Sequence, residues 1–82
     1  GAEVVFDAWR KATGRPRAVL DRKRRRLIEA AFANHNTEDL IAAVKGWRHS
    51  PHHCGVNERH TVYNDLGLLL RDSAHIDRFR DF

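Results

Sequence analysis

The chain has few of the residues that make disulfides, metal sites or membrane spans. It has 82 residues and a single cysteine, Cys54, which excludes an internal disulfide and a zinc site built from several cysteines. No stretch of the chain approaches the roughly 18 apolar residues of a membrane span. No basic segment followed by an apolar one opens the chain, so we expect no signal peptide. The sequence therefore predicts a soluble protein of a reducing compartment, held together by packing alone.

The length predicts one small domain over residues 1–82. With 41% hydrophobic residues the chain has enough apolar side chains for one core and few more. A domain of this size rarely encloses a substrate pocket, and the sequence has no Walker loop, no nucleophile elbow and no paired carboxylates. We therefore expect a binding or scaffolding domain of a longer protein. We expect no enzymatic activity, no cofactor, no small-molecule substrate and no membrane contact.

Two segments in the first half have the periodicity of amphipathic helices. The first covers residues 3–13 and is followed by Gly14, which suits a left-handed C-terminal stop. Its expected buried residues are Val5, Ala8, Trp9 and Ala12. The second follows Asp21, the expected N-cap, and runs to about Ala33. Its expected buried residues are Leu27, Ile28, Ala31 and Phe32.

Two more helices are predicted in the second half. Thr37 is the expected N-cap of the third, and Gly46 inside it costs about 1 kcal/mol relative to alanine, which indicates close approach by another segment. Residues 48–61 have no apolar period and form an expected irregular loop. The fourth helix starts at about Asn64, with Ser73 as either a bend or a new N-cap. Expected core residues of these two helices are Leu40, Ala43, Val44, Trp47, Leu66, Leu69, Leu70, Ile76 and Phe79.

Together these patterns predict an all-α fold. It is a small bundle of about four helices with a long irregular loop before the last helix. The only β-type signal lies at residues 61–63 and needs no strand pairing. Most aromatic side chains fall on or beside the apolar stripes, so we expect them in the core and not as stacking platforms for bases.

The basic residues are concentrated in one part of the sequence. Residues 10–26 hold nine of the fifteen Lys and Arg residues and one aspartate, so the remaining chain is net acidic. Cations in the opening turn of a helix cost about 0.3–1 kcal/mol each, but they become favourable when a phosphate docks there. The alternative is a solvated charged face. We expect contacts with nucleic-acid phosphates from Arg15, Arg17, Arg22, Lys23, Arg25 and Arg26.

The second and third helices have the outline of a helix-turn-helix motif. However, the third helix begins with Glu38 and Asp39, whose carboxylates would meet the phosphates of DNA. We therefore expect the second helix to make the contacts.

The loop over residues 48–61 is rich in histidine. His49, His52, His53, Cys54 and His60 are dense enough for zinc, but their spacing matches no common zinc site. Loop packing or contact with phosphates and bases is the favoured interpretation, with zinc as the alternative.

Several short segments form a combined pattern across nearly the whole chain. They are Val5-Phe6-Asp7-Ala8-Trp9, Pro16-Arg17-Ala18, Leu20 with Asp21-Arg22-Lys23-Arg24, Glu38-Asp39-Leu40, Ser50-Pro51 with His53 and Gly55-Val56-Asn57-Glu58-Arg59, and Tyr63-Asn64-Asp65-Leu66 with Leu69-Leu70-Arg71-Asp72. In this order they resemble the C-terminal helical domain of phage and prophage replication-initiation proteins, known as replisome organisers or helix-turn-helix replication proteins. The sequence departs from that pattern at His52, where an aromatic residue is expected, and at Cys54, where methionine is expected.

The resemblance implies a role at a replication origin in the cytoplasm of a bacterial host. This role would be binding DNA, duplex or single-stranded, recruiting the replicative helicase or its loader, or both. Similar helical bundles are the last domain of some phage and plasmid primases, so an accessory primase domain is a further alternative. For Arg71 we expect an ion pair with a loop carboxylate such as Glu58, with DNA contact as the alternative. A helicase or loader would dock on the acidic residues Glu38, Asp39, Asp65, Asp72, Asp77 and Asp81.

Overall fold

Helices account for all the regular secondary structure of the chain. The computed structural model describes residues 1–82, and the elements are α1 (Ala2–Thr13), α2 (Arg22–Ala31), α3 (Thr37–Gly46), the 3-10 helix η1 (Trp47–His49), α4 (Leu66–Leu69) and α5 (Ser73–Arg80). The predicted all-α fold with a long loop before the last helices is confirmed. The one β-type feature is an isolated antiparallel bridge between Cys54 and Val62. No helix has both the length and the apolar content that a membrane crossing requires.

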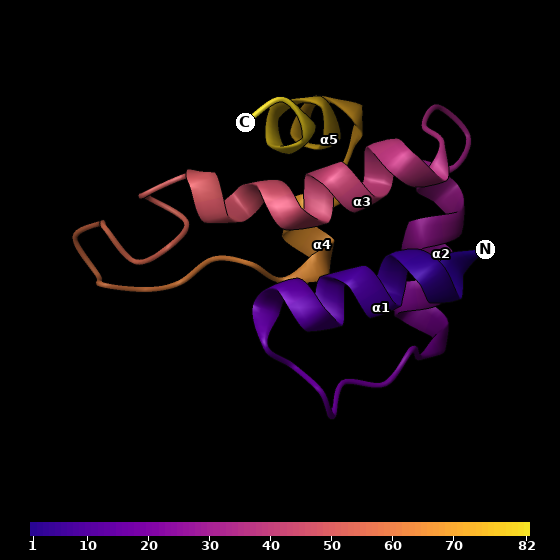
Figure 1. Ribbon diagram of the computed structural model, residues 1–82, viewed down its shortest axis with the longest axis horizontal. Helices are drawn as coiled ribbons and strands as arrows, with labels where there is room; N and C mark the ends of the chain where they lie inside the picture. Colours follow the sequence, from indigo (N-terminus) through magenta and orange to yellow (C-terminus); the bar gives the residue numbers. More distant parts are fainter.

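The helices pack around α3. In Figure 1, α1 lies along one side of α3, α5 lies on the other side, and α2 crosses one end of the pair. The short α4 joins these layers, because it contacts α2, α3 and α5. The segment between η1 and α4 forms a loop that projects from the end opposite α2 (Figure 1). This arrangement places the beginning of α2 next to α4.

The core consists of fourteen buried apolar residues drawn from all five α-helices. Most expected core residues are among them, but Leu27, Phe32 and Trp47 are only half-buried and pack against the edge of the core. In α1 the buried stripe itself differs from the expectation. Its buried residues are Ala2, Val5, Phe6 and Trp9. Ala8 and Ala12 are only half-buried, because they face a groove beside α3 that no other segment fills. The predicted buried stripe of α1 was therefore wrong at these two positions.

Three helix ends follow from local side-chain chemistry. Gly14 ends α1 with a φ of 67°, and Asp21 caps α2 by accepting a hydrogen bond of 2.8 Å from the Arg24 N–H, so both predictions are confirmed. The expected cap of α3 was wrong by one residue. Asn36, not Thr37, has the extended backbone of an N-cap and accepts a hydrogen bond of 2.8 Å from the Asp39 N–H.

The expected fourth helix is two helices. Asp72 is extended (φ −160°), and its carboxylate accepts a hydrogen bond of 2.9 Å from the His75 N–H, so it is the N-cap of α5. Ser73 is therefore the first residue of α5 and not its cap. Asp65 caps α4 in a similar way through the Gly67 N–H. The break leaves Arg71 in the turn between two short helices.

Replacing Asn36 by alanine is expected to lower the free energy of unfolding by about 1 kcal/mol, because the Asp39 N–H loses its side-chain acceptor. Urea denaturation followed by circular dichroism measures this loss. Thr37→Ala is the matched control and should change stability by less than about 0.5 kcal/mol. A larger loss for Thr37→Ala than for Asn36→Ala would contradict the observed cap.

Candidate nucleic-acid interface

Cationic side chains from two separate parts of the chain surround one open hollow. Arg22, Lys23 and Arg26 come from the first two turns of α2, and Arg71 comes from the turn after α4. Leu27 and Gly67 complete the lining of the hollow, which has a volume of about 750 Å³. We call this set of four cations the basic hollow. It exists because α2 packs against α4.

The four cations of the basic hollow have no partner inside the protein. All four are exposed, and none forms an ion pair or a side-chain hydrogen bond within the chain. Their positive charges therefore add to the partial positive charge of the N–H groups at the start of α2. An anion at this place would be attracted by side chains and helix end together.

Three other residues that were predicted to contact nucleic acid lie outside the basic hollow. Arg15 donates a hydrogen bond of 2.5 Å to the Asn64 side chain, and its guanidinium lies over the Trp9 ring at 5.1 Å. Arg25 forms an ion pair of 2.8 Å with Glu3. Arg17 is exposed on the connector between α1 and α2. The structure thus brings Arg22, Lys23 and Arg26 together, and the nucleic-acid contacts of all six residues stay a prediction.

Trp9 contacts both of the segments that form the basic hollow. Its ring is fully buried, and its Nε1–H donates a hydrogen bond of 2.9 Å to the Asn64 carbonyl, just before α4. Arg24 lies over the same ring at 5.2 Å and donates a hydrogen bond to the Val19 carbonyl. Because Trp9 touches both the start of α2 and the segment before α4, it fixes the two sides of the hollow relative to each other.

Arg71 is the residue of the basic hollow for which the sequence favoured an ion pair and offered DNA contact only as the alternative. The expected ion pair with a loop carboxylate is not formed, because the long loop projects from the end of the molecule opposite α2, whereas Arg71 lines the basic hollow beside α2. From the sequence, DNA contact was the alternative expectation for Arg71, and the helix break near Ser73 was the other signal. The position of Arg71 depends on the packing of α4 against α2, which local patterns do not report.

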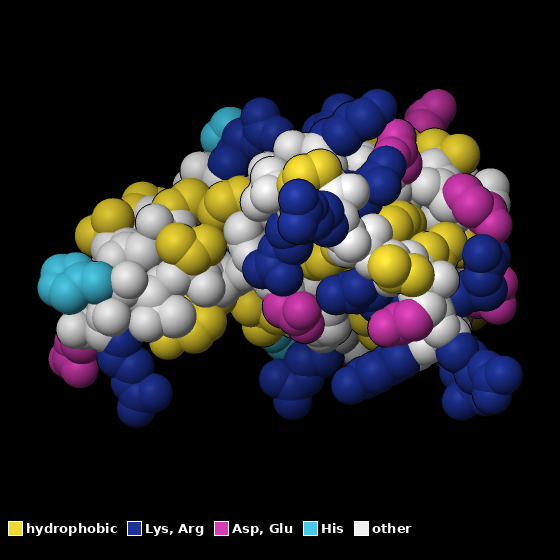
Figure 2. Space-filling view, turned by 90° about the horizontal axis from the view of Figure 1, so that it is seen from below, with side chains coloured by type: hydrophobic (Ala, Val, Ile, Leu, Met, Phe, Trp, Pro, Cys, Tyr) yellow, Lys and Arg dark blue, Asp and Glu magenta, His cyan; other side chains and the backbone are white.

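The surface view shows where the charge lies. Seen from the side of α1 and the connector, Lys and Arg side chains are spread over the end of the molecule that α1 and α2 form, and the end formed by the long loop carries few charges (Figure 2). Asp and Glu side chains lie among them on the same end, so this end is rich in charges of both signs and Lys and Arg are the more numerous in residues 10–26 (Figure 2).

Two of the four histidines of the long loop make packing contacts. His53 is buried, its Nδ1 lies 2.6 Å from Ser50 Oγ, and its ring packs edge-on against Phe79 at 4.8 Å. His52 stacks on Tyr63 at 5.7 Å. No group of three His, Cys, Asp or Glu side chains lies close enough together to hold a metal ion. Loop packing, one of the favoured interpretations of these histidines, is what the structure shows for His52 and His53.

His53 is expected to make the domain less stable at acidic pH. Burial lowers the pKa of His53 below its ordinary value of 6.5, with a smaller effect from nearby positive charges. Below pH 6.5 the unfolded chain therefore binds a proton that the folded chain does not, and the free energy of unfolding falls as the pH drops from about 7 to about 5. Urea denaturation across this range measures the slope. His53→Asn should have a shallower slope, and an unchanged slope would contradict the role of His53.

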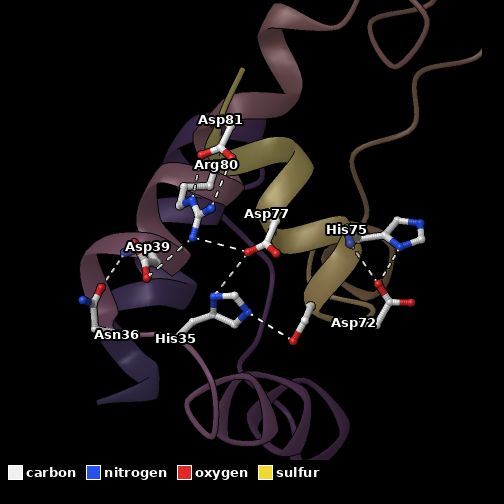
Figure 3. A network of polar contacts seen from close by, with 9 residues as sticks. His35, Asn36, Asp39, Asp72, His75, Asp77, Arg80 and Asp81 are labelled. Carbon is white, nitrogen blue, oxygen red and sulfur yellow. Dashed lines mark hydrogen bonds and ion pairs between the residues drawn. The ribbon is translucent and has the colours of Figure 1, made fainter.

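The acidic residues near α5 have partners within the chain. Figure 3 shows Arg80 among three carboxylates, at 2.8 Å from Asp81, 3.3 Å from Asp77 and 4.0 Å from Asp39. The hydrogen bond from Arg80 lowers the pKa of Asp81, and hydrogen bonds from His75 lower the pKa of Asp72. Most of these carboxylates therefore already bind a cationic side chain of the protein, in contrast to the unpaired cations of the basic hollow.

Comparison of the chain with models of protein families, with curated proteins and with solved structures gives no match. The resemblance to replication-initiation proteins therefore stays a prediction. Function must be inferred from the chemistry of the surface itself.

Proposed function

We propose that this domain binds nucleic acid, and DNA in particular, through contacts between the phosphate backbone and the four cations of the basic hollow. The observation that supports the proposal is the convergence of four exposed, unpaired cations from α2 and the α4–α5 turn on one hollow. A surface selected only for solubility does not need cations at a helix N-terminus, where each costs about 0.3–1 kcal/mol. A docked phosphate reverses the sign of that interaction.

The binding should be directed mainly at the backbone. Arginine and lysine contacts to phosphates fix the position of a protein on DNA but carry no direct sequence information. α3 is a poor recognition helix, because Glu38 and Asp39 occupy its first turn. We therefore infer weak sequence preference for this domain alone, and selection of a site would come from other parts of a longer protein.

The resemblance of the sequence segments to replication-initiation proteins suggests in which process the proposed DNA binding takes part. With it, we propose that the DNA contact serves the initiation of replication by a phage or prophage protein. The alternative of helicase docking on the acidic residues gains no support from the structure, because Arg80 and His75 already engage most carboxylates around α5.

A salt titration tests the proposal. Labelled duplex and single-stranded oligonucleotides are titrated with the domain at several salt concentrations, and fluorescence anisotropy follows binding. Four phosphate contacts give a slope of log K against log[salt] of about −3.6 on duplex and about −2.8 on single strands. Absence of binding to either form at about 50 mM salt would overturn the proposal.

A further inference from the structure

A second surface feature lies on another part of the molecule, between α1 and α3. It is a groove of about 360 Å³. Its floor is formed by Val4, Ala8, Ala12 and Ile41, and Lys45 and Arg48 stand at its rim. None of these residues lines the basic hollow. We call this feature the α1–α3 groove.

The floor of the groove is an apolar row that the fold leaves uncovered. Val4, Ala8 and Ala12 are spaced by four residues, so they lie along one face of α1, beside the stripe that enters the core. Val4, a large aliphatic side chain in the first turn of α1, is 52% exposed. The two alanines are small enough to let the backbone of another helix come close.

The rim of the groove is positively charged. Lys45 and Arg48 are exposed and have no carboxylate partner, and the only side-chain bond of Arg48 is to the Lys45 carbonyl. The one acidic residue at the groove, Asp7, is already engaged by Arg10 at 2.6 Å and Lys11 at 3.0 Å. A partner that carries acidic residues beside an apolar stripe would complement both the rim and the floor.

We propose that the α1–α3 groove docks an acidic amphipathic helix of a partner protein. Two packed helices leave a groove into which the side chains of a third helix can pack, and an apolar stripe at i, i+3, i+4 and i+7 would cover the floor. Glu or Asp residues beside the stripe would meet Lys45 and Arg48. Nucleic acid fits this place less well, because an apolar floor offers no donor to phosphates. The proposal does not depend on DNA binding at the basic hollow.

The test uses a helical model peptide as the probe, with leucines in a helical stripe flanked by glutamates. Two control peptides have lysines in place of the glutamates or the same composition in scrambled order. Titration into ¹⁵N-labelled domain, followed by heteronuclear NMR, should shift the amides of Val4, Ala8, Ala12 and Ile41 with the glutamate peptide only. Lys45→Glu/Arg48→Glu should weaken its binding about tenfold or more, because rim charges then repel it.

The matched control is Arg59→Glu/Arg78→Glu, which changes the net charge equally at exposed positions outside the groove. It should bind the peptide like the unmodified domain, and so should Arg22→Glu/Lys23→Glu, which separates this proposal from DNA binding. The proposal is overturned if the glutamate peptide does not bind, or if the scrambled or lysine peptide binds equally well. It is also overturned if DNA, or a second copy of the domain at higher concentration, is what shifts the groove residues.

Discussion

Replacing Arg22 and Lys23 together by glutamate is expected to remove most nucleic-acid binding and at the same time to make the domain more stable. Both residues are exposed and unpaired in the first turn of α2. For stability they are misplaced, because they repel the positive end of the helix, and carboxylates there would be favoured. Glutamate at position 22 would also face Arg26 one turn later, which adds a favourable pair. The gain in the free energy of unfolding should be about 1 kcal/mol or more.

Binding should change in the opposite direction and by a larger amount. Removing two of four phosphate contacts halves the salt slope on duplex from about −3.6 to about −1.8, and affinity at about 50 mM salt should fall on the order of 100-fold. Arg71→Glu alone should reduce the slope by about 0.9, because Arg71 lines the same hollow from another element. Anisotropy titrations at several salt concentrations measure these changes.

The control for the double variant Arg22→Glu/Lys23→Glu is a change of equal charge elsewhere. Arg59→Glu/Arg78→Glu reverses two exposed arginines outside the basic hollow. If binding depends on the hollow, this variant keeps nearly the full salt slope. An equal loss of affinity in both double variants would mean that only the net charge matters, and it would remove the hollow as a specific site.

Replacing Gly46 by alanine is expected to have the largest effect on stability. A Cβ atom at position 46 would lie 1.8 Å from the backbone oxygen of Phe79 and 2.7 Å from its carbonyl carbon. No rotamer relieves this overlap, because the neighbour is backbone of α5, so α3 and α5 would have to separate. Since Phe79 is fully buried between them, the loss should be about 3 kcal/mol or more, beyond the gain in helix propensity of about 1 kcal/mol.

Thermal and urea denaturation measure this effect, and Gly67→Ala is the control. A Cβ atom at position 67 would meet only the carboxylate end of Asp65 at 2.9 Å, which can move aside. Gly67→Ala should therefore change stability by about 1 kcal/mol or less. If Gly46→Ala were as stable as the unmodified domain, the close packing of α3 against α5 would be wrong.

Local chemistry made much of the fold predictable from the sequence. Apolar spacing gave the all-α class, Gly14 and Asp21 marked two helix ends, and Gly46 indicated a close approach that proved to be the backbone of α5. Each of these signals depends on a residue and its near neighbours in the chain. The one-residue error at the cap of α3 arose because Asn36 and Thr37 are both good caps, and only the backbone angles distinguish them.

Features that depend on contacts between distant segments could not be predicted. Asp72 divides the expected fourth helix by a local cap on α5, one residue before Ser73, where the sequence indicated a bend or a new N-cap, but the packing of α4 against α2 is not a local signal. This break places Arg71 beside Arg22 and Arg26, so the basic hollow was only partly visible as a run of cations. The partners of Arg15 and Arg25 also lie 49 and 22 residues away in the chain.

One NMR titration tests the central claim most directly. A short duplex is added to the ¹⁵N-labelled domain at low salt, and the amide shifts are mapped onto the chain. Docking of a phosphate backbone at the basic hollow predicts that the largest shifts occur together at residues 22–26, at Gly67 and at Arg71. Shifts centred on the first turn of α3 or on the long loop, with residues 22–26 unchanged, would contradict the account.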